Sequence, residues 1–167
     1  ATSFLAFFIS FGPLTSADPL INVTATPIDN TAGVTTTYII VFTTITPLTV
    51  VTTPDRIIIT FLTGFDASGA TVDGATVTQS GSDPTLVSAT ATVVTLDVTA
   101  DEAAGIQNIV MNGIINTQTV GTEKTVSIET QDGDNAFTTL DGPTDSAVFT
   151  ISAAAVATLT IKTQPSA

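Results

Sequence analysis

The stretch Val34-Thr35-Thr36-Thr37-Tyr38-Ile39-Ile40-Val41-Phe42-Thr43-Thr44-Ile45-Thr46 decides the fold class of this chain. It consists of β-branched and aromatic residues, which favour β-strands. Alternate side chains of a strand point to opposite faces, and here both faces are apolar: Tyr38, Ile40 and Phe42 on one, Ile39, Val41 and Ile45 on the other. A strand that is apolar on both faces belongs in the middle of a sheet. Pro47 should end it.

Segments of similar character recur along the chain. We expect nine further strands, at residues 20–28, 56–62, 75–79, 86–90, 92–99, 106–115, 124–131, 147–152 and 156–162. Turn-forming Gly, Pro, Asp and Asn residues separate them. Residues 99–105 are the one helix-like segment, and residues 132–145 are expected to form an acidic loop. Many short strands with almost no helix predict an all-β fold, an antiparallel β-sandwich of Ig-like or jelly-roll-like type, in a single domain over residues 14–167.

The N-terminal stretch Ala1–Phe11 is apolar and uncharged, and it holds four of the nine Phe residues. As a strand it would gather large apolar side chains on one face: Leu5, Phe7, Ile9 and Phe11. The stretch is too short for a bilayer, which needs about 20 apolar residues, and it lacks the basic start of a secretory signal. Gly12-Pro13 breaks regular structure and separates residues 1–13 from the domain as a strand and a hinge.

Two interpretations of this stretch remain open. It could be the first strand of its own domain, buried in the same core. Alternatively it could be a donor strand, which inserts into a groove on the next copy of the same protein.

The composition excludes several classes of function. The net charge of -12 argues against nucleic acid and against anionic membrane surfaces as partners. The chain has no Cys and no His, so no Ser-His or Cys-His nucleophile exists, and we expect no enzyme and no catalytic residue. The scarcity of Lys and Arg suits an extracellular or cell-surface protein, present as a mature chain after removal of its signal peptide.

Two candidate sites stand out among the polar residues. Asp132, Asp134, Asn135 and Asp141 offer the hard oxygen ligands that Ca²⁺ prefers, although the spacing is not that of an EF-hand and Asp is equally common in plain turns. Calcium is the one cofactor that the sequence suggests. Asn22-Val23-Thr24 is an N-glycosylation sequon on the polar face of its strand, so glycans at Asn22 are the second candidate.

Three segments occur in a characteristic order: Thr-Tyr-Ile-Ile-Val-Phe-Thr-Thr (37–44), Pro-Asp-Arg-Ile-Ile-Ile-Thr-Phe-Leu-Thr-Gly-Phe (54–65) and Asp-Glu-Ala-Ala-Gly-Ile-Gln-Asn-Ile-Val-Met-Asn-Gly-Ile-Ile-Asn (101–116). They resemble an Ig-like module of secreted bacterial and archaeal surface proteins over about residues 20–153. Leu62-Thr63 and Thr117 stand where that module usually has Pro. Ala6-Phe7-Phe8 is similar to the start of mature TasA/camelysin-type filament subunits, and archaeal bundling pili and threads also join β-sandwiches by donated N-terminal strands.

The resemblance and the N-terminal stretch together favour one function. We expect a structural subunit of an extracellular, pilus-like filament, a homopolymer in which the N-terminal strand of one copy complements the next. The alternative is a monomeric or lattice-forming cell-surface module, an adhesin or a surface-layer tile, whose N-terminal strand pairs within its own chain.

Overall fold

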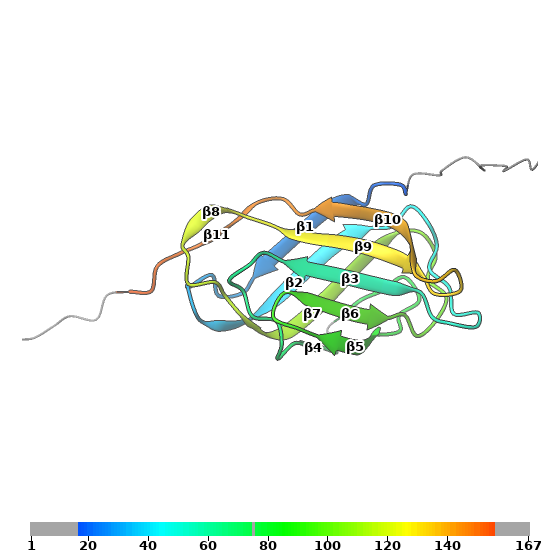
Figure 1. Cartoon of the computed structure of the whole chain (residues 1–167), viewed down its shortest axis with the longest axis horizontal. Coiled ribbons are helices and arrows are strands. Elements are labelled where there is room, and N and C mark those ends of the chain that lie inside the picture. Colours follow the sequence, from blue (N-terminus) through cyan, green and yellow to red (C-terminus); the bar gives the residue numbers. More distant parts are fainter. Residues whose placement is uncertain (1–16, 75, 156–167) are drawn as a thin grey trace, which may run out of the picture.

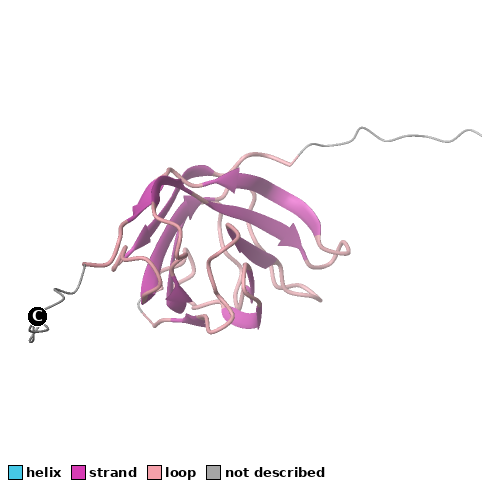
Figure 2. Cartoon of the chain, turned by 60° about the vertical axis from the view of Figure 1, so that its left-hand side comes forward, coloured by secondary structure: helices cyan, strands magenta, loops and turns pink. Residues whose placement is uncertain are grey.

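The computed structural model describes residues 17–74 and 76–155. Within these residues the chain forms β-strands and no helix (Figures 1 and 2). The strands are β1 (Ile21–Pro27), β2 (Thr35–Thr43), β3 (Arg56–Phe61), β4 (Thr71–Val72), β5 (Thr85–Ala89), β6 (Val93–Asp97), β7 (Ile106–Ile115), β8 (Gly121–Lys124), β9 (Val126–Asp132), β10 (Thr138–Asp145) and β11 (Phe149–Ile151). The all-β prediction is confirmed.

The strands form two main sheets and one short ribbon. The four-stranded sheet has the order β1-β2-β7-β4, the five-stranded sheet has the order β10-β9-β3-β6-β5, and β11 pairs with β8. Every strand pair is antiparallel. The two main sheets lie face to face, and their strands cross at an angle in Figure 1. This arrangement is the antiparallel β-sandwich that the strand pattern predicts.

β2 lies between β1 and β7, as its two apolar faces predict. Tyr38, Ile40 and Phe42 point between the sheets and have no exposed surface, whereas Ile39 and Val41 point outward and are half-buried. The register explains the inward set, since Ile40 pairs with Ile109 of β7, which is also fully buried.

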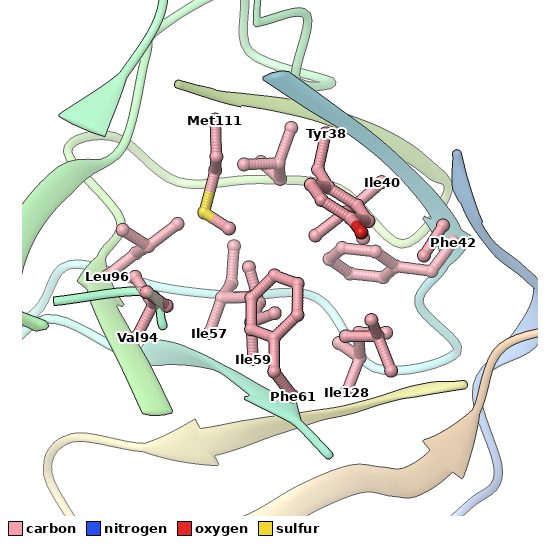
Figure 3. Packing of buried hydrophobic residues seen from close by; sticks show 14 of the residues in the cluster. Tyr38, Ile40, Phe42, Ile57, Ile59, Phe61, Val94, Leu96, Met111 and Ile128 are labelled. Atoms are coloured by element: carbon pink, nitrogen blue, oxygen red, sulfur yellow. The ribbon is translucent and has the colours of Figure 1, made fainter. Parts of the chain in front are cut away.

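The core lies between the two main sheets. In Figure 3, Tyr38, Ile40, Phe42 and Met111 of the four-stranded sheet face side chains from the opposite sheet. The largest side chains that are almost completely buried are Tyr38, Phe42, Ile40, Leu48, Ile57, Ile59, Leu96, Ile109, Met111, Ile114, Ile128 and Ile151. Burying a large apolar side chain contributes about 1.5–3 kcal/mol, so the contacts between the sheets are the main source of stability.

Residues 132–145 differ from the acidic loop that we expected. The second part of the segment is β10, an edge strand that pairs with β9. Its ladder has register shifts on both sides of Asp141, and that side chain is completely buried. A strand at a sheet edge needs few apolar residues, and a carboxylate that points inward looks in the sequence like part of a solvated turn.

Three other segments differ from the expected pattern. Residues 99–105 form no helix, because Glu102 pairs with Leu48 in an isolated antiparallel bridge. The strand expected at residues 75–79 is reduced to a bridge between Val77 and Asn108. Residues 124–131 divide between β8 and β9, which Thr125 separates. The strand expected at residues 156–162 lies outside the described residues.

Tyr38 is at the centre of an aromatic cluster and carries a buried hydrogen bond. Its ring centroid lies 5.3 Å from that of Phe61 and 5.8 Å from that of Phe149, in edge-to-face geometry. Its phenol donates to Asn116 Oδ1 at 2.6 Å, and Asn116 Nδ2 donates to the carbonyls of Asp29 and Thr31. Burial raises the pKa of the Tyr38 phenol above its ordinary value. The folded state therefore favours the neutral phenol.

This burial makes alkaline unfolding measurable through a single chromophore. Because the folded state holds the Tyr38 proton more tightly, its contribution to stability is complete below the ordinary tyrosine pKa of about 10 and is lost above it, at about 1.4 kcal/mol per pH unit. Tyr38 is the only tyrosine. We expect the tyrosinate absorbance and the loss of β-sheet circular dichroism to rise together. Tyr38→Phe should reduce the alkaline sensitivity, and ionisation of Tyr38 with an intact β-sheet spectrum would contradict the assignment.

Candidate assembly surfaces

The proposed donor side chains Leu5, Phe7, Ile9 and Phe11 lie outside the described residues. The candidate surfaces described below therefore belong to the β-sandwich itself. The chain enters the described body at Ala17, next to β10, where Asp18 pairs with Asp141 and its carbonyl accepts from the Gly142 N–H at 2.7 Å.

The acidic residues of the proposed calcium site have protein donors. Asp132 Oδ1 accepts from the backbone N–H groups of Asp134 and Asn135 at 2.9 and 3.1 Å. Asp134 accepts from the N–H groups of Thr53 at 2.8 Å and Thr52 at 3.4 Å. Among the described residues, no group of three or more His, Cys, Asp or Glu side chains could hold a metal ion. Calcium binding here stays a prediction, for which the contacts give no support.

Asp141 fastens β10 to the segment that follows β2. One carboxylate oxygen accepts from the N–H groups of Ile45 and Thr46 at 3.0 and 2.9 Å, and the other accepts from the Thr46 hydroxyl at 2.8 Å. The Asp141 N–H donates to the Thr130 hydroxyl at 3.1 Å. A buried carboxylate is tolerated when donors of this kind surround it. Asp141 therefore holds β10 and the segment after β2 together.

Other carboxylates also accept hydrogen bonds from backbone N–H groups along residues 45–55, which connect β2 to β3. Asp55 Oδ2 accepts from the Thr49 N–H at 2.7 Å, and its other oxygen accepts from the Gly133 N–H at 2.8 Å. Asp101 accepts from the Val50 N–H at 2.8 Å. Together with Asp134 and Asp141, these carboxylates bind backbone donors at intervals along the whole connection. The acidic residues thus hold a long connection against the body in a chain with few cations.

Removal of the Asp141 carboxylate tests this interpretation. Asp141→Ala leaves three donors without their acceptor, and an unsatisfied buried group costs about 1–3 kcal/mol, so we expect a loss of about 2–4 kcal/mol in the free energy of unfolding. Asp145→Ala is the matched control, since Asp145 is exposed on the same strand; it should change stability by less than about 0.5 kcal/mol. Urea unfolding measures both. Equal effects of the two substitutions would show that the Asp141 carboxylate does not hold β10 and the segment after β2 together.

Asn22 is exposed on β1, at an irregularity where the register with β2 shifts between Ile21 and Thr24. Its φ of 56° lies in the left-handed region, which Asn tolerates better than most residues. Thr24 of the sequon is also exposed. An oligosaccharide at Asn22 would extend into solvent, so the structure leaves the proposed glycosylation sterically open.

The outer faces of the two main sheets differ in charge. On the five-stranded sheet, Arg56 Nε donates to Asp97 Oδ1 at 2.8 Å, and its guanidinium carbon lies 3.7 Å from the centroid of the Phe137 ring. Glu129 pairs with Ile58 on the same face. By contrast, β1, β2 and β7 contain no charged residue at all. We call the outward-facing residues of these three strands the uncharged face.

Rows of Thr and aliphatic side chains cover the uncharged face. Thr24 lies opposite Val41, which lies opposite Asn108, and the exposed Val77 pairs with Asn108 from the far side. Ile106, 58% exposed, lies opposite Thr43. In a chain with a net charge of -12, a second copy would meet no charged side chain of these three strands on this face.

The lateral edges of the sandwich also differ. The β1 and β10 edges are joined, since the Ala147 N–H donates to the Val23 carbonyl at 2.9 Å and the Leu20 N–H donates to the Thr144 hydroxyl at 3.1 Å. At the β4 edge, the chain beyond β4 continues along β7, where Val77 and Asn108 exchange two backbone hydrogen bonds. These contacts satisfy the backbone groups of three edges at least in part.

β5 is different. Among the described residues, no hydrogen bond joins its outer side to another segment. Leu86 lies opposite Leu96, which is completely buried, yet Leu86 itself is 39% exposed. The neighbouring Val87 lies where the register shifts and is 46% exposed. The strand carries no charged residue. We call β5, with Leu86 and Val87, the open edge.

The sequence pattern did not reveal the open edge or the acidic residues that bind the connection between β2 and β3. The sequence signal for the open edge was the uncharged stretch Thr85-Leu86-Val87-Ser88-Ala89, but nothing in it indicates that the strand is at an edge. In the sequence, these acidic residues resemble ordinary turn residues. Gln107 was also missed: it is completely buried, and neither atom of its amide has a hydrogen-bond partner among the described residues.

Comparisons with known proteins complete the description. The sequence matches no family model, and no curated protein matches it significantly. Among solved structures, the crystal structure of BslA, a bacterial hydrophobin, is 15% identical with a TM-score of 0.46, and the match covers 81% of this chain and 98% of that chain. In the part of the chain that the structure describes, no helix is long and apolar enough to cross a membrane.

Proposed function

We propose that this chain is a structural subunit of an extracellular, pilus-like filament, in which residues 1–11 of one copy complement the sandwich of the next. The observation that carries the proposal is that the described residues form a sandwich core, while residues 1–11 are a further uncharged, apolar stretch of the sequence. Residues 20–151 supply the members of the described cluster, many of them completely buried. In this proposal the apolar residues 1–11 are available for contact with another copy.

Physical chemistry gives this stretch a reason to associate with another copy. Leu5, Phe7, Ile9 and Phe11 would each contribute about 1.5–3 kcal/mol on burial, which is enough to drive assembly. A contact between two different surfaces of identical copies does not close on itself, so it produces an open filament.

The charge and the residue inventory fit a structural role outside the cell. Without Cys or His the chain lacks the common nucleophile–base pairs, and the proposal includes no catalytic activity and no cofactor. An extracellular location would also allow modification of the exposed Asn22.

Substitutions in the N-terminal stretch test the proposal. Deleting residues 1–11 should leave a folded, monomeric body with nearly unchanged circular dichroism, and it should abolish fibres in negative-stain electron microscopy. Phe7→Asp should act like the deletion, because it would bury an unpaired charge. Ser10→Asp, on the other face of the expected strand, adds the same charge and should still assemble. Wild-type fibres from the deletion variant would refute the donor-strand proposal.

The uncharged face favours a second candidate function, a lattice-forming surface module. In that case copies would associate through the outer face of β1, β2 and β7, and residues 1–11 would not be needed. Val41→Asp places a charge at the centre of this face, where the side chain is half-buried and points away from the core. The lattice candidate predicts that Val41→Asp abolishes assembly measured by light scattering, whereas the filament candidate predicts that fibres persist. Thr60→Asp, on the outer face of the five-stranded sheet, is the control and should assemble in both cases.

A further inference from the structure

We infer that the open edge, β5 with Leu86 and Val87, is the acceptor for residues 1–11 of a second copy. The inference rests on the proposed function and names the surface that the donated strand would occupy. An added strand would extend the five-stranded sheet beyond β5, which is its last strand (Figure 1).

The backbone of β5 is suited to this role. In the described structure its outer side has no hydrogen-bond partner, and exposed edge strands are templates for pairing with another chain. Natural edges are commonly protected by charged side chains. Thr85-Leu86-Val87-Ser88-Ala89 has none.

The side chains at this edge indicate that part of the apolar surface is left uncovered. Leu86 points to the same side as the buried Leu96 but remains 39% exposed, because β5 is the last strand of its sheet among the described residues. Val72 and Ala89 are partly buried against the core at the same side of the sandwich. An added strand with large apolar side chains on its inner face would cover Leu86. The continuous set Leu5, Phe7, Ile9 and Phe11 has this property.

Distances across the sheet favour a donor from another copy. The chain enters the body beside β10, which is at the opposite edge of the sheet from β5. Strands lie about 4.8 Å apart, so a strand added beyond β5 would lie about 24 Å from β10. Six residue steps separate Phe11 from Ala17, and they span at most about 22 Å. Pairing with β5 that includes Phe11 is therefore possible only in another copy.

Two defective variants test the assignment together. Phe7→Asp disables the donor and leaves the open edge intact, whereas Leu86→Asp disables the open edge and leaves the donor intact. Each alone should be monomeric by size-exclusion chromatography with light scattering. An equimolar mixture should form a one-to-one dimer and no fibres, because only one functional contact remains. Ile28→Asp is the matched control for Leu86→Asp, since Ile28 is an aliphatic residue 70% exposed at another place, and it should form fibres.

The outcomes separate this inference from the proposed function. If Leu86→Asp forms fibres as Ile28→Asp does, while deletion of residues 1–11 abolishes them, the acceptor assignment is wrong and the filament proposal stands. If the deletion variant forms wild-type fibres, both are wrong. A mixture that remains monomeric, with both variants folded by circular dichroism, also overturns the assignment.

A cross-linking measurement does not depend on whether Leu86→Asp folds. The chain has no Cys, so Ser88→Cys can be combined with single Cys substitutions at each of residues 1–11 in turn. We expect oxidation of assembled fibres to give covalent ladders for a few neighbouring donor positions, and no ladder when Ser88→Cys is replaced by Ser127→Cys on β9. Equal ladders from both acceptor positions, or none from Ser88→Cys, would overturn the assignment.

Discussion

The hydrogen bond between a carboxylate and a backbone N–H is the constraint that fixes the connections of this sandwich. The chain has 15 acidic residues and three basic ones, so most carboxylates cannot form ion pairs. Buried carboxylates need compensating donors, and backbone N–H groups supply them for Asp141 and Asp55. The long connection between β2 and β3 is thereby ordered without a disulfide. The two main sheets pack around the apolar core, and buried carboxylates hold the connection between β2 and β3 that joins them.

The sequence predicted the parts of the fold that periodicity controls. β2, β3 and β7 are nearly as expected, because alternating or doubly apolar stretches have few other solutions. β10 was mistaken for a loop, since its inward residue is the acid Asp141, and the segment around Glu102 was mistaken for a helix. In both cases the deciding contacts are made with residues far away in the chain, which no local pattern records.

The candidate sites show the same limit. The residue types around Asp132 suggest calcium, which stays a prediction; what the sequence does not record is that their oxygens accept from nearby N–H groups. The open edge could not be predicted because a sheet edge is a property of topology: Leu86 looks like any core residue until the strand order places nothing beyond it. The two surfaces suited to self-association, the open edge and the uncharged face, emerge only when the charges are mapped onto the sheets.

The position of Arg56 has a consequence for proteolysis. Trypsin-like proteases cut after Arg or Lys, and the described residues contain only Arg56 and Lys124. Arg56 begins a strand that is paired on both sides, with β6 and with β9, and its side chain is held by Asp97 and Phe137. A protease must draw several residues of extended chain into its active site, so cleavage here would require the middle of the five-stranded sheet to open. Cleavage after Arg56 should therefore be slow while the body stays folded, even in a medium rich in such enzymes.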